Sequence, residues 1–80
     1  MSYVPFAPLK YDGQKGLITA QINKGFYKDL AQVLVYYEVP YRKEAGVINI
    51  RRKLSQDKDL VWNYTSKALN EDWLKTHTHH

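Results

Sequence analysis

The chain has 80 residues, of which 12 are Lys or Arg and 8 are Asp or Glu, so its formal net charge is +4. It contains no cysteine, which excludes disulfides and thiolate metal sites and fits a reducing compartment. No apolar run approaches the roughly 18–20 residues that span a bilayer, and the first ten residues do not follow the pattern of a secretory signal. We therefore expect one soluble, cytoplasmic domain over residues 1–80, with a single modest core.

The basic charge is concentrated in the first two thirds of the chain. Residues 1–54 hold nine basic and four acidic side chains, a net charge of +5. Residues 55–80 hold three basic and four acidic side chains, a net charge of −1. Such an excess favours an anionic partner, although it does not determine the fold.

The beginning of the chain predicts extended structure. Residues 1–16 contain Pro5 and Pro8, which lack a backbone donor, and the turn-forming sequence YDGQKG. We predict an extended, irregular N-terminal segment here. Residues 17–22 lie between glycines and are rich in side chains that suit a pleated surface, which predicts a strand.

The next segment carries two conflicting signals. From Phe26 onwards, apolar residues recur at helical spacing, whereas the sequence VLVYYEV is rich in β-branched and aromatic side chains. We predict a helical turn over residues 26–31 and a strand over 33–41. A continuous helix over 26–37 is the alternative.

A β-hairpin is predicted over residues 33–54, with its second strand over 47–54 and KEAG as the connection. Alternation of side chains sends Ile48 and Ile50 toward the core, on the same side as Arg52. The other basic residues of this strand then face the opposite way.

The last element is predicted to be a helix. Ser55 is a suitable N-cap, and Asp57 and Asp59 suit the positive end of the helix dipole better than they suit a metal site. Asn70 is placed to cap a separate final turn. Residues 76–80 predict a disordered tail that contains histidines.

Together these elements predict an α+β fold. A three-stranded antiparallel sheet, formed by 17–22, 33–41 and 47–54, would pack against a C-terminal helix. An SH3-like, partly open barrel with the same helix is the alternative.

Basic and aromatic side chains on the outer sheet face form the candidate functional site. Lys and Arg neutralise phosphates, and an exposed aromatic ring can stack on a base. The alternative is a solvated face whose charges prevent association between sheet edges. We predict a small, non-enzymatic protein that binds DNA or RNA through Tyr36, Arg42, Lys43, Arg51 and Lys53.

The chain also has more aromatic residues than one small core needs, with seven Tyr, two Trp and two Phe. Tyr and Trp favour interfaces because they combine apolar area with a polar group. The alternative function is therefore a protein-interaction module, such as an inhibitor or adaptor. It would bind a partner or a second copy through Trp62, Leu69 and Trp73.

We expect no catalytic site, metal or cofactor. Every histidine lies near the end of the chain, at positions 77, 79 and 80, with no carboxylate or thiolate close by. With no cysteine present, this leaves no evident pairing of a nucleophile with a base. Phosphate-loop, dinucleotide-binding and zinc-protease motifs are absent from the sequence.

The stretch VINIRRKLSQDKD resembles a passage of strand, basic residues and helix in small RelE-like toxin ribonucleases. The resemblance covers about a sixth of the chain, and the rest shows no matching order of elements. Because some of these toxins use Arg, Lys and Tyr in place of a triad, it implies a third function, RNA cleavage. Its site would comprise Arg42, Arg51, Arg52 and Tyr36.

Overall fold

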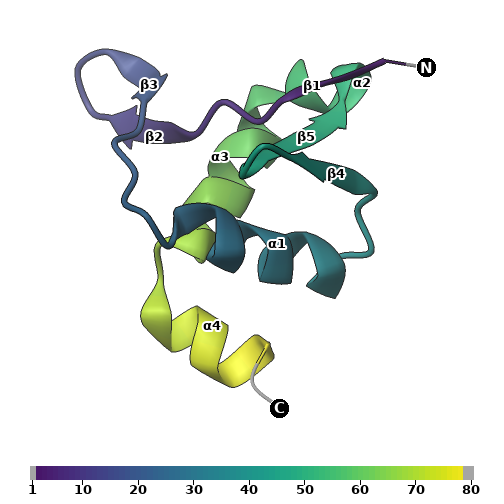
Figure 1. Ribbon diagram of the computed structural model, residues 1–80. Helices are drawn as coiled ribbons and strands as arrows, with labels where there is room; N and C mark the ends of the chain where they lie inside the picture. Colours follow the sequence, from purple (N-terminus) through teal and green to yellow (C-terminus); the bar gives the residue numbers. More distant parts are fainter. Residues whose placement is uncertain (1, 79–80) are drawn as a thin grey trace.

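A computed structural model describes residues 2–78 and confirms the predicted α+β class. Its main sheet has three antiparallel strands in the order β1-β5-β4, and a separate hairpin pairs β2 with β3 (Figure 1). The strands are β1 (Tyr3–Pro5), β2 (Leu9–Asp12), β3 (Gly16–Thr19), β4 (Tyr41–Glu44) and β5 (Val47–Arg51). The helices are α1 (Phe26–Tyr36), α2 (Arg52–Ser55), α3 (Lys58–Ala68) and α4 (Glu71–His77). Because the strands form two separate sheets, the partly open barrel is not the observed fold.

The predicted strand over residues 33–41 is wrong, and the alternative of a helix is correct. In α1, the side chains of Phe26, Leu30, Val33 and Leu34 form one buried stripe. This stripe belongs to the same core cluster as Ile48 and Ile50 of β5. Burial of a complete helical face therefore outweighs the preference of β-branched residues for strands.

Helix α1 ends in a Schellman motif. Glu38 has φ +58°, and its N–H donates to the Val35 carbonyl at 3.0 Å. The N–H of Val39 donates to the Leu34 carbonyl at 2.8 Å, which satisfies another carbonyl of the last turn. The chain then reverses toward β4, which begins only at Tyr41.

The hairpin between β4 and β5 has a shorter connection than predicted. Lys43 and Glu44 are the last residues of β4, so only Ala45 and Gly46 form the turn. Both turn residues have positive φ, +52° and +79°. Two such residues are typical of a type I′ turn, whose twist matches that of the flanking strands.

The third strand of the main sheet comes from the segment predicted to be irregular. β1 pairs antiparallel with β5, with Tyr3 opposite Arg51 and Pro5 opposite Asn49. Pro5 is tolerated because β1 is an edge strand, where a missing N–H leaves no ladder bond unmade. The next residue, Phe6, is almost fully buried in the core.

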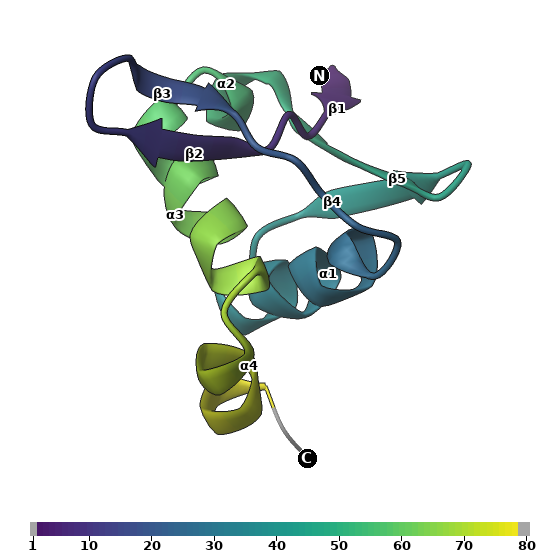
Figure 2. The same cartoon turned by 90° about the vertical axis from the view of Figure 1, so that its left-hand side faces the viewer.

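The predicted strand over 17–22 is present in part, but outside the main sheet. Gly16–Thr19 pairs with Leu9–Asp12, and the backbone N–H of Leu9 donates to the Thr65 hydroxyl of α3 at 3.3 Å. Figure 2 shows this second hairpin beside α3, whereas the hairpin of β4 and β5 lies beside α1. Since a local hairpin closes a shorter loop than a distant pairing, β3 pairs with β2.

The strand predicted over 47–54 ends early, at Arg51. Ser55 is the last residue of α2, so its predicted role as an N-cap is wrong. Asp57 takes this role, because its carboxylate accepts the Leu60 N–H at 3.2 Å. The predicted cap at Asn70 is confirmed, with its side chain accepting the Trp73 N–H at 3.0 Å.

Near the end of the described chain, α4 runs through Thr76 to His77. The hydroxyl of Thr78 donates to the side-chain oxygen of Gln32 in α1 at 2.9 Å. His79 and His80, which the tail prediction includes, lie outside the described residues. Over residues 2–78, no helix has both the length and the apolar character that crossing a membrane requires.

Candidate nucleic-acid interface

The structure brings Arg42 and Arg51 to one face of the main sheet. Arg42 lies opposite Asn49 in the register of β4 and β5, and Arg51 is two residues after Asn49. Side chains two apart in a strand share a face, so both arginines project away from Ile48 and Ile50. Both arginines are exposed, as predicted from the alternation of side chains.

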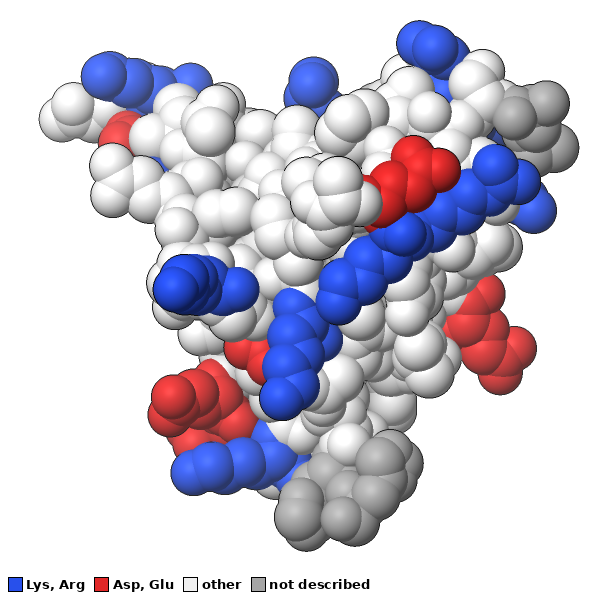
Figure 3. Space-filling model, viewed as in Figure 1, with Lys and Arg blue, Asp and Glu red and all other residues white. Residues whose placement is uncertain are grey.

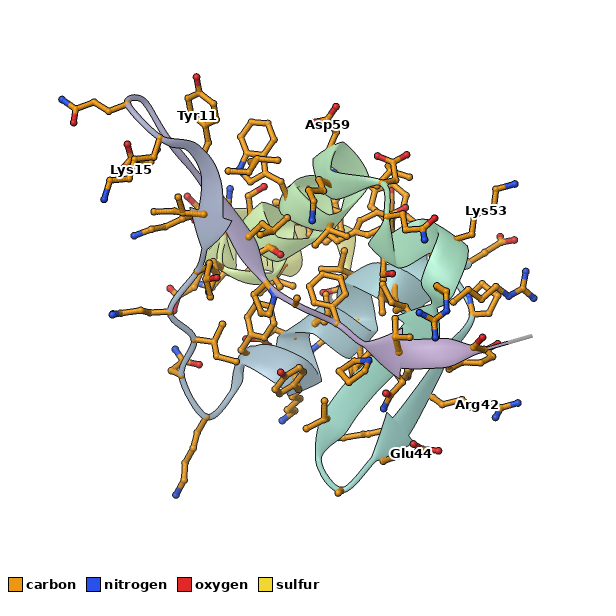
Figure 4. The ribbon with its side chains drawn as sticks, turned by 90° about the horizontal axis from the view of Figure 1, so that it is seen from above. Tyr11, Lys15, Arg42, Glu44, Lys53 and Asp59 are labelled. Carbon is orange, nitrogen blue, oxygen red and sulfur yellow. The ribbon has the colours of Figure 1, made fainter. Side chains whose placement is uncertain are left out.

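Lys53 lies beside this face and not within it. It belongs to the short helix α2, which follows β5 directly, and its side chain is exposed. Figure 4 shows Arg42 and Lys53 extending from the same side of the molecule, with β1 nearby. Arg52, which was predicted to share the core side of the strand, instead begins α2 and is exposed.

Two of the predicted site residues lie elsewhere. Lys43 pairs with Ile48, so its side chain leaves the sheet on the face opposite to Arg42. Tyr36 ends α1, whose buried stripe packs on that same inner face. The structure therefore does not gather Tyr36 with the three arginines that the toxin resemblance implies.

Tyr3 of β1 joins the arginines, although the sequence analysis did not include it. The Arg42 guanidinium carbon lies 4.4 Å from the centroid of the Tyr3 ring. Because β5 runs between β1 and β4, this contact crosses the central strand above Asn49. Asn49, which lies opposite Arg42 on the same face, is only 9% exposed.

We call this surface the basic end. It consists of Tyr3, Arg42, Arg51, Arg52 and Lys53. The backbone N–H of Arg52 donates to the Ser2 carbonyl at 3.1 Å, so the start of β1 is held against the start of α2. The beginning of the chain thus meets the hairpin of β4 and β5, and the helix that follows it, at one end of the sheet.

Acidic groups limit how far this surface extends. Glu44 follows Arg42 by two residues on β4 and shares its face. On the other side, Lys53 borders a shallow hollow of about 540 Å³. Its remaining lining residues are Gln56, Asp57, Lys58 and Asp59. On the face of the molecule drawn in Figure 3, Lys and Arg atoms form a diagonal row with acidic atoms beside it, so both signs of charge occur together on this face.

A cluster of aromatic rings holds α4 against α1 and α3, and it accounts for several of the surplus aromatic residues. The rings belong to Tyr36, Tyr37, Tyr64, Trp73 and His77. The rings of Trp73 and His77 stack with their centroids 4.5 Å apart, and the ring centroids of Tyr37 and Tyr64 are 5.5 Å apart. Burial raises the pKa of the Tyr64 phenol, and the nearby Tyr37 and Asp57 raise it further.

An apolar pocket of about 420 Å³ lies beside this cluster. It is lined by Ala31, Gln32, Val35, Tyr36, Tyr41, His77 and Thr78. Tyr41 projects from the inner face of β4, opposite to Arg42, so the pocket is separate from the basic end.

The three residues predicted to contact a partner do not form one surface. Trp73 packs within the aromatic cluster, whereas Trp62 on α3 is 38% exposed and Leu69, directly after α3, is 47% exposed. Trp62 lies 5.8 Å from the ring of Tyr11, which is 60% exposed on the hairpin of β2 and β3. An exposed aromatic pair therefore lies at this hairpin, away from the basic end (Figure 4).

Within residues 2–78, no group of three or more His, Asp or Glu side chains is arranged to hold a metal ion. Asp57 is the N-cap of α3 and Asp59 lies in its first turn, so both acidic residues are at the positive end of the helix dipole, as predicted.

Comparisons of the chain with protein families, with curated proteins and with solved structures find no match. The basic end must therefore be interpreted from its own residues. The exposure of Arg42 and Arg51 on one face was predictable from alternation and charge, whereas Lys53 reaches the same end of the sheet from helix α2. Tyr3 was not predictable, because no sequence signal indicated that residues 3–5 pair with β5.

Proposed function

We propose that this protein is a small, non-enzymatic nucleic-acid-binding protein and that the basic end contacts its ligand. The observation that supports this proposal is the grouping of four exposed cationic side chains around one end of the sheet. These are Arg42, Arg51, Arg52 and Lys53. Neutralising phosphates with Lys and Arg releases counterions, which supplies most of the affinity of nonspecific binding.

The proposed interface differs from the surface that the sequence suggested. It keeps Arg42, Arg51 and Lys53, adds the neighbouring Arg52 and Tyr3, and leaves out Lys43 and Tyr36. Four phosphate contacts give an expected slope of roughly −3 to −4 for log K against log salt on duplex DNA.

Fluorescence anisotropy with labelled, random-sequence nucleic acids, measured over a salt series, tests this proposal. The double variant Arg42→Ala and Arg51→Ala should reduce the magnitude of the slope by about 2, because each lost phosphate contact removes about 0.9. The matched control is Lys15→Ala with Lys24→Ala, which removes two exposed lysines outside the basic end. Absence of binding at low salt would refute the function, and equal losses for the two double variants would refute the interface.

A second candidate function, self-association as a protein-interaction module, is favoured by the exposed pair of Tyr11 and Trp62. Large exposed aromatic side chains are enriched at interfaces. Light scattering over a concentration series should then show a dimer, and Trp62→Ser should return it to a monomer. A monomer at every concentration would refute this candidate without affecting the nucleic-acid proposal.

A further inference from the structure

The basic end contains one aromatic residue, Tyr3, and the position of this ring bears on which form of nucleic acid the surface recognises. Proteins that bind single strands without sequence preference combine a basic groove with aromatic rings on which the bases stack. Such stacking contributes roughly 1–3 kcal/mol per base. A base can stack only on a ring that has one face open to solvent.

The ring of Tyr3 does not offer such a face toward Arg42. The guanidinium lies 4.4 Å from the ring centroid, which is a cation–π contact, and Tyr3 itself is only partly exposed. On the neighbouring strand, Arg51 is directly opposite Tyr3. The Arg42 guanidinium therefore covers a face of the ring on which a base would otherwise stack, and Arg51 adds a second positive charge on the neighbouring strand.

The same contact prepares Arg42 for a phosphate. A guanidinium that stacks through its flat face keeps its N–H donors at the edges, where they can meet two phosphate oxygens at once. Because the ring holds the side chain in place, less rotamer freedom is lost when the phosphate binds. Tyr3 acts in this arrangement as a support for Arg42.

The spacing of the arginines suits a phosphate backbone. Arg42 and Arg51 are diagonal neighbours on adjacent strands, so their Cα atoms are expected to lie about 7–8 Å apart. Side chains this close together can contact neighbouring phosphates of one strand. Arg52 and Lys53 continue the basic charge directly after Arg51 along the chain.

Exposed rings do occur elsewhere, but outside the basic end. Tyr36 and Tyr37, which are 48% and 40% exposed, belong to the aromatic cluster at the end of α1. Tyr11, the partner of Trp62, projects from the hairpin of β2 and β3. Figure 4 shows Tyr11 and Lys15 at the opposite side of the molecule from Arg42 and Lys53. Bases of a strand held at the basic end would not reach this pair.

We infer that the basic end recognises the phosphate backbone of double-stranded nucleic acid, without stacking on bases and without reading their sequence. This inference rests on the proposed nucleic-acid function. Duplex is favoured over single strand because its phosphates are twice as dense along the axis. Each phosphate contact also adds more to the slope of log K against log salt on a duplex, about 0.9, than on a single strand, about 0.7.

The test is a competition experiment on the 80-residue chain. Unlabelled single-stranded DNA, single-stranded RNA, duplex DNA and duplex RNA each displace a labelled random duplex from the protein. We expect duplexes to compete at least about threefold better than single strands of equal phosphate concentration, and A·T-rich and G·C-rich duplexes to compete equally. The two duplex competitors show whether B-form DNA or A-form RNA is the better ligand.

Two substitutions at Tyr3 distinguish a ring that supports the Arg42 side chain from a ring that stacks on bases. Tyr3→Phe keeps the ring and should leave duplex affinity within about twofold, whereas Tyr3→Leu removes the support and should weaken it about threefold or more. Circular dichroism confirms that both variants are folded. In both variants, the preference for duplex should persist.

Three results would overturn the inference while leaving the proposed function intact. These are tighter binding of single strands, a tenfold or larger preference between A·T-rich and G·C-rich duplexes, and a loss in Tyr3→Leu that is confined to single strands. Failure of every nucleic acid to bind at low salt would instead refute the proposed function, and this inference with it.

Discussion

Replacing Glu38 with glycine should stabilise this protein. Glu38 occupies the C′ position of the Schellman motif after α1, with φ +58°. A residue with a side chain pays about 1–2 kcal/mol for the left-handed conformation, whereas glycine adopts it without steric penalty. Glycine loses more backbone entropy on folding, about 0.5–1 kcal/mol. The net gain expected for Glu38→Gly is therefore about 0.5–1 kcal/mol.

Urea unfolding, followed by tryptophan fluorescence, measures this gain. For such a small domain, the free energy of unfolding falls by about 1 kcal/mol per molar urea, so the midpoint should rise by about 0.5–1 M. The hydrogen bonds from Glu38 N–H to Val35 and from Val39 N–H to Leu34 involve only backbone atoms, so the substitution preserves them.

The matched control is Glu38→Ala. This variant removes a carboxylate from the negative end of the helix dipole, which is itself a small gain, but it keeps the cost of positive φ. The difference between the glycine and alanine variants therefore isolates the backbone contribution. If the two midpoints coincide, the stabilisation arises from charge, and the reasoning from backbone conformation is refuted.

Three further predictions concern the core, a helix cap and alkaline pH. Leu34→Ala should cost about 2–5 kcal/mol in urea unfolding because Leu34 is completely buried, and a loss below about 1 kcal/mol would contradict its place in the core. Asp57→Ala should cost about 1 kcal/mol, whereas Asp57→Asn, which also caps well, should remain close to the original protein. A loss of equal size in both variants would show that the charge, and not the cap, matters. The raised pKa of Tyr64 means that the unfolded chain releases this proton first, at its ordinary value of 10.0. The contribution of Tyr64 to stability should thus be fully present below pH 10 and be lost as the pH rises through the folded pKa. The melting temperature should therefore fall more steeply with pH than in Tyr64→Phe. Thermal unfolding over a pH series measures this difference.

The proposed interface also changes how the basic charge of the chain is interpreted. The net charge of residues 1–54 indicated an anionic partner but could not say which side chains act together. Lys43 and Arg42 are consecutive in β4, and the alternation of a strand sends them to opposite faces. Basic residues that are neighbours in the sequence thus lie on opposite faces of the sheet. Tyr3, near the beginning of the chain, contacts one of them, Arg42.

Sequence patterns correctly predicted the α+β class, the burial of Ile48 and Ile50, the exposure of Arg42 and Arg51, and the cap at Asn70. These features depend on local rules, because the alternation of a strand and the capping of a helix involve residues close together in the chain.

Other features depend on contacts between segments that are distant in the sequence. Residues 33–36 are helical because α1 buries one face on β5, and residues 3–5 form a strand because β5 has an unpaired edge. The support of Arg42 by Tyr3 joins positions 39 residues apart across a strand that neither belongs to. Such contacts depend on which surfaces meet when the chain folds, and the local preferences of a sequence do not encode that choice.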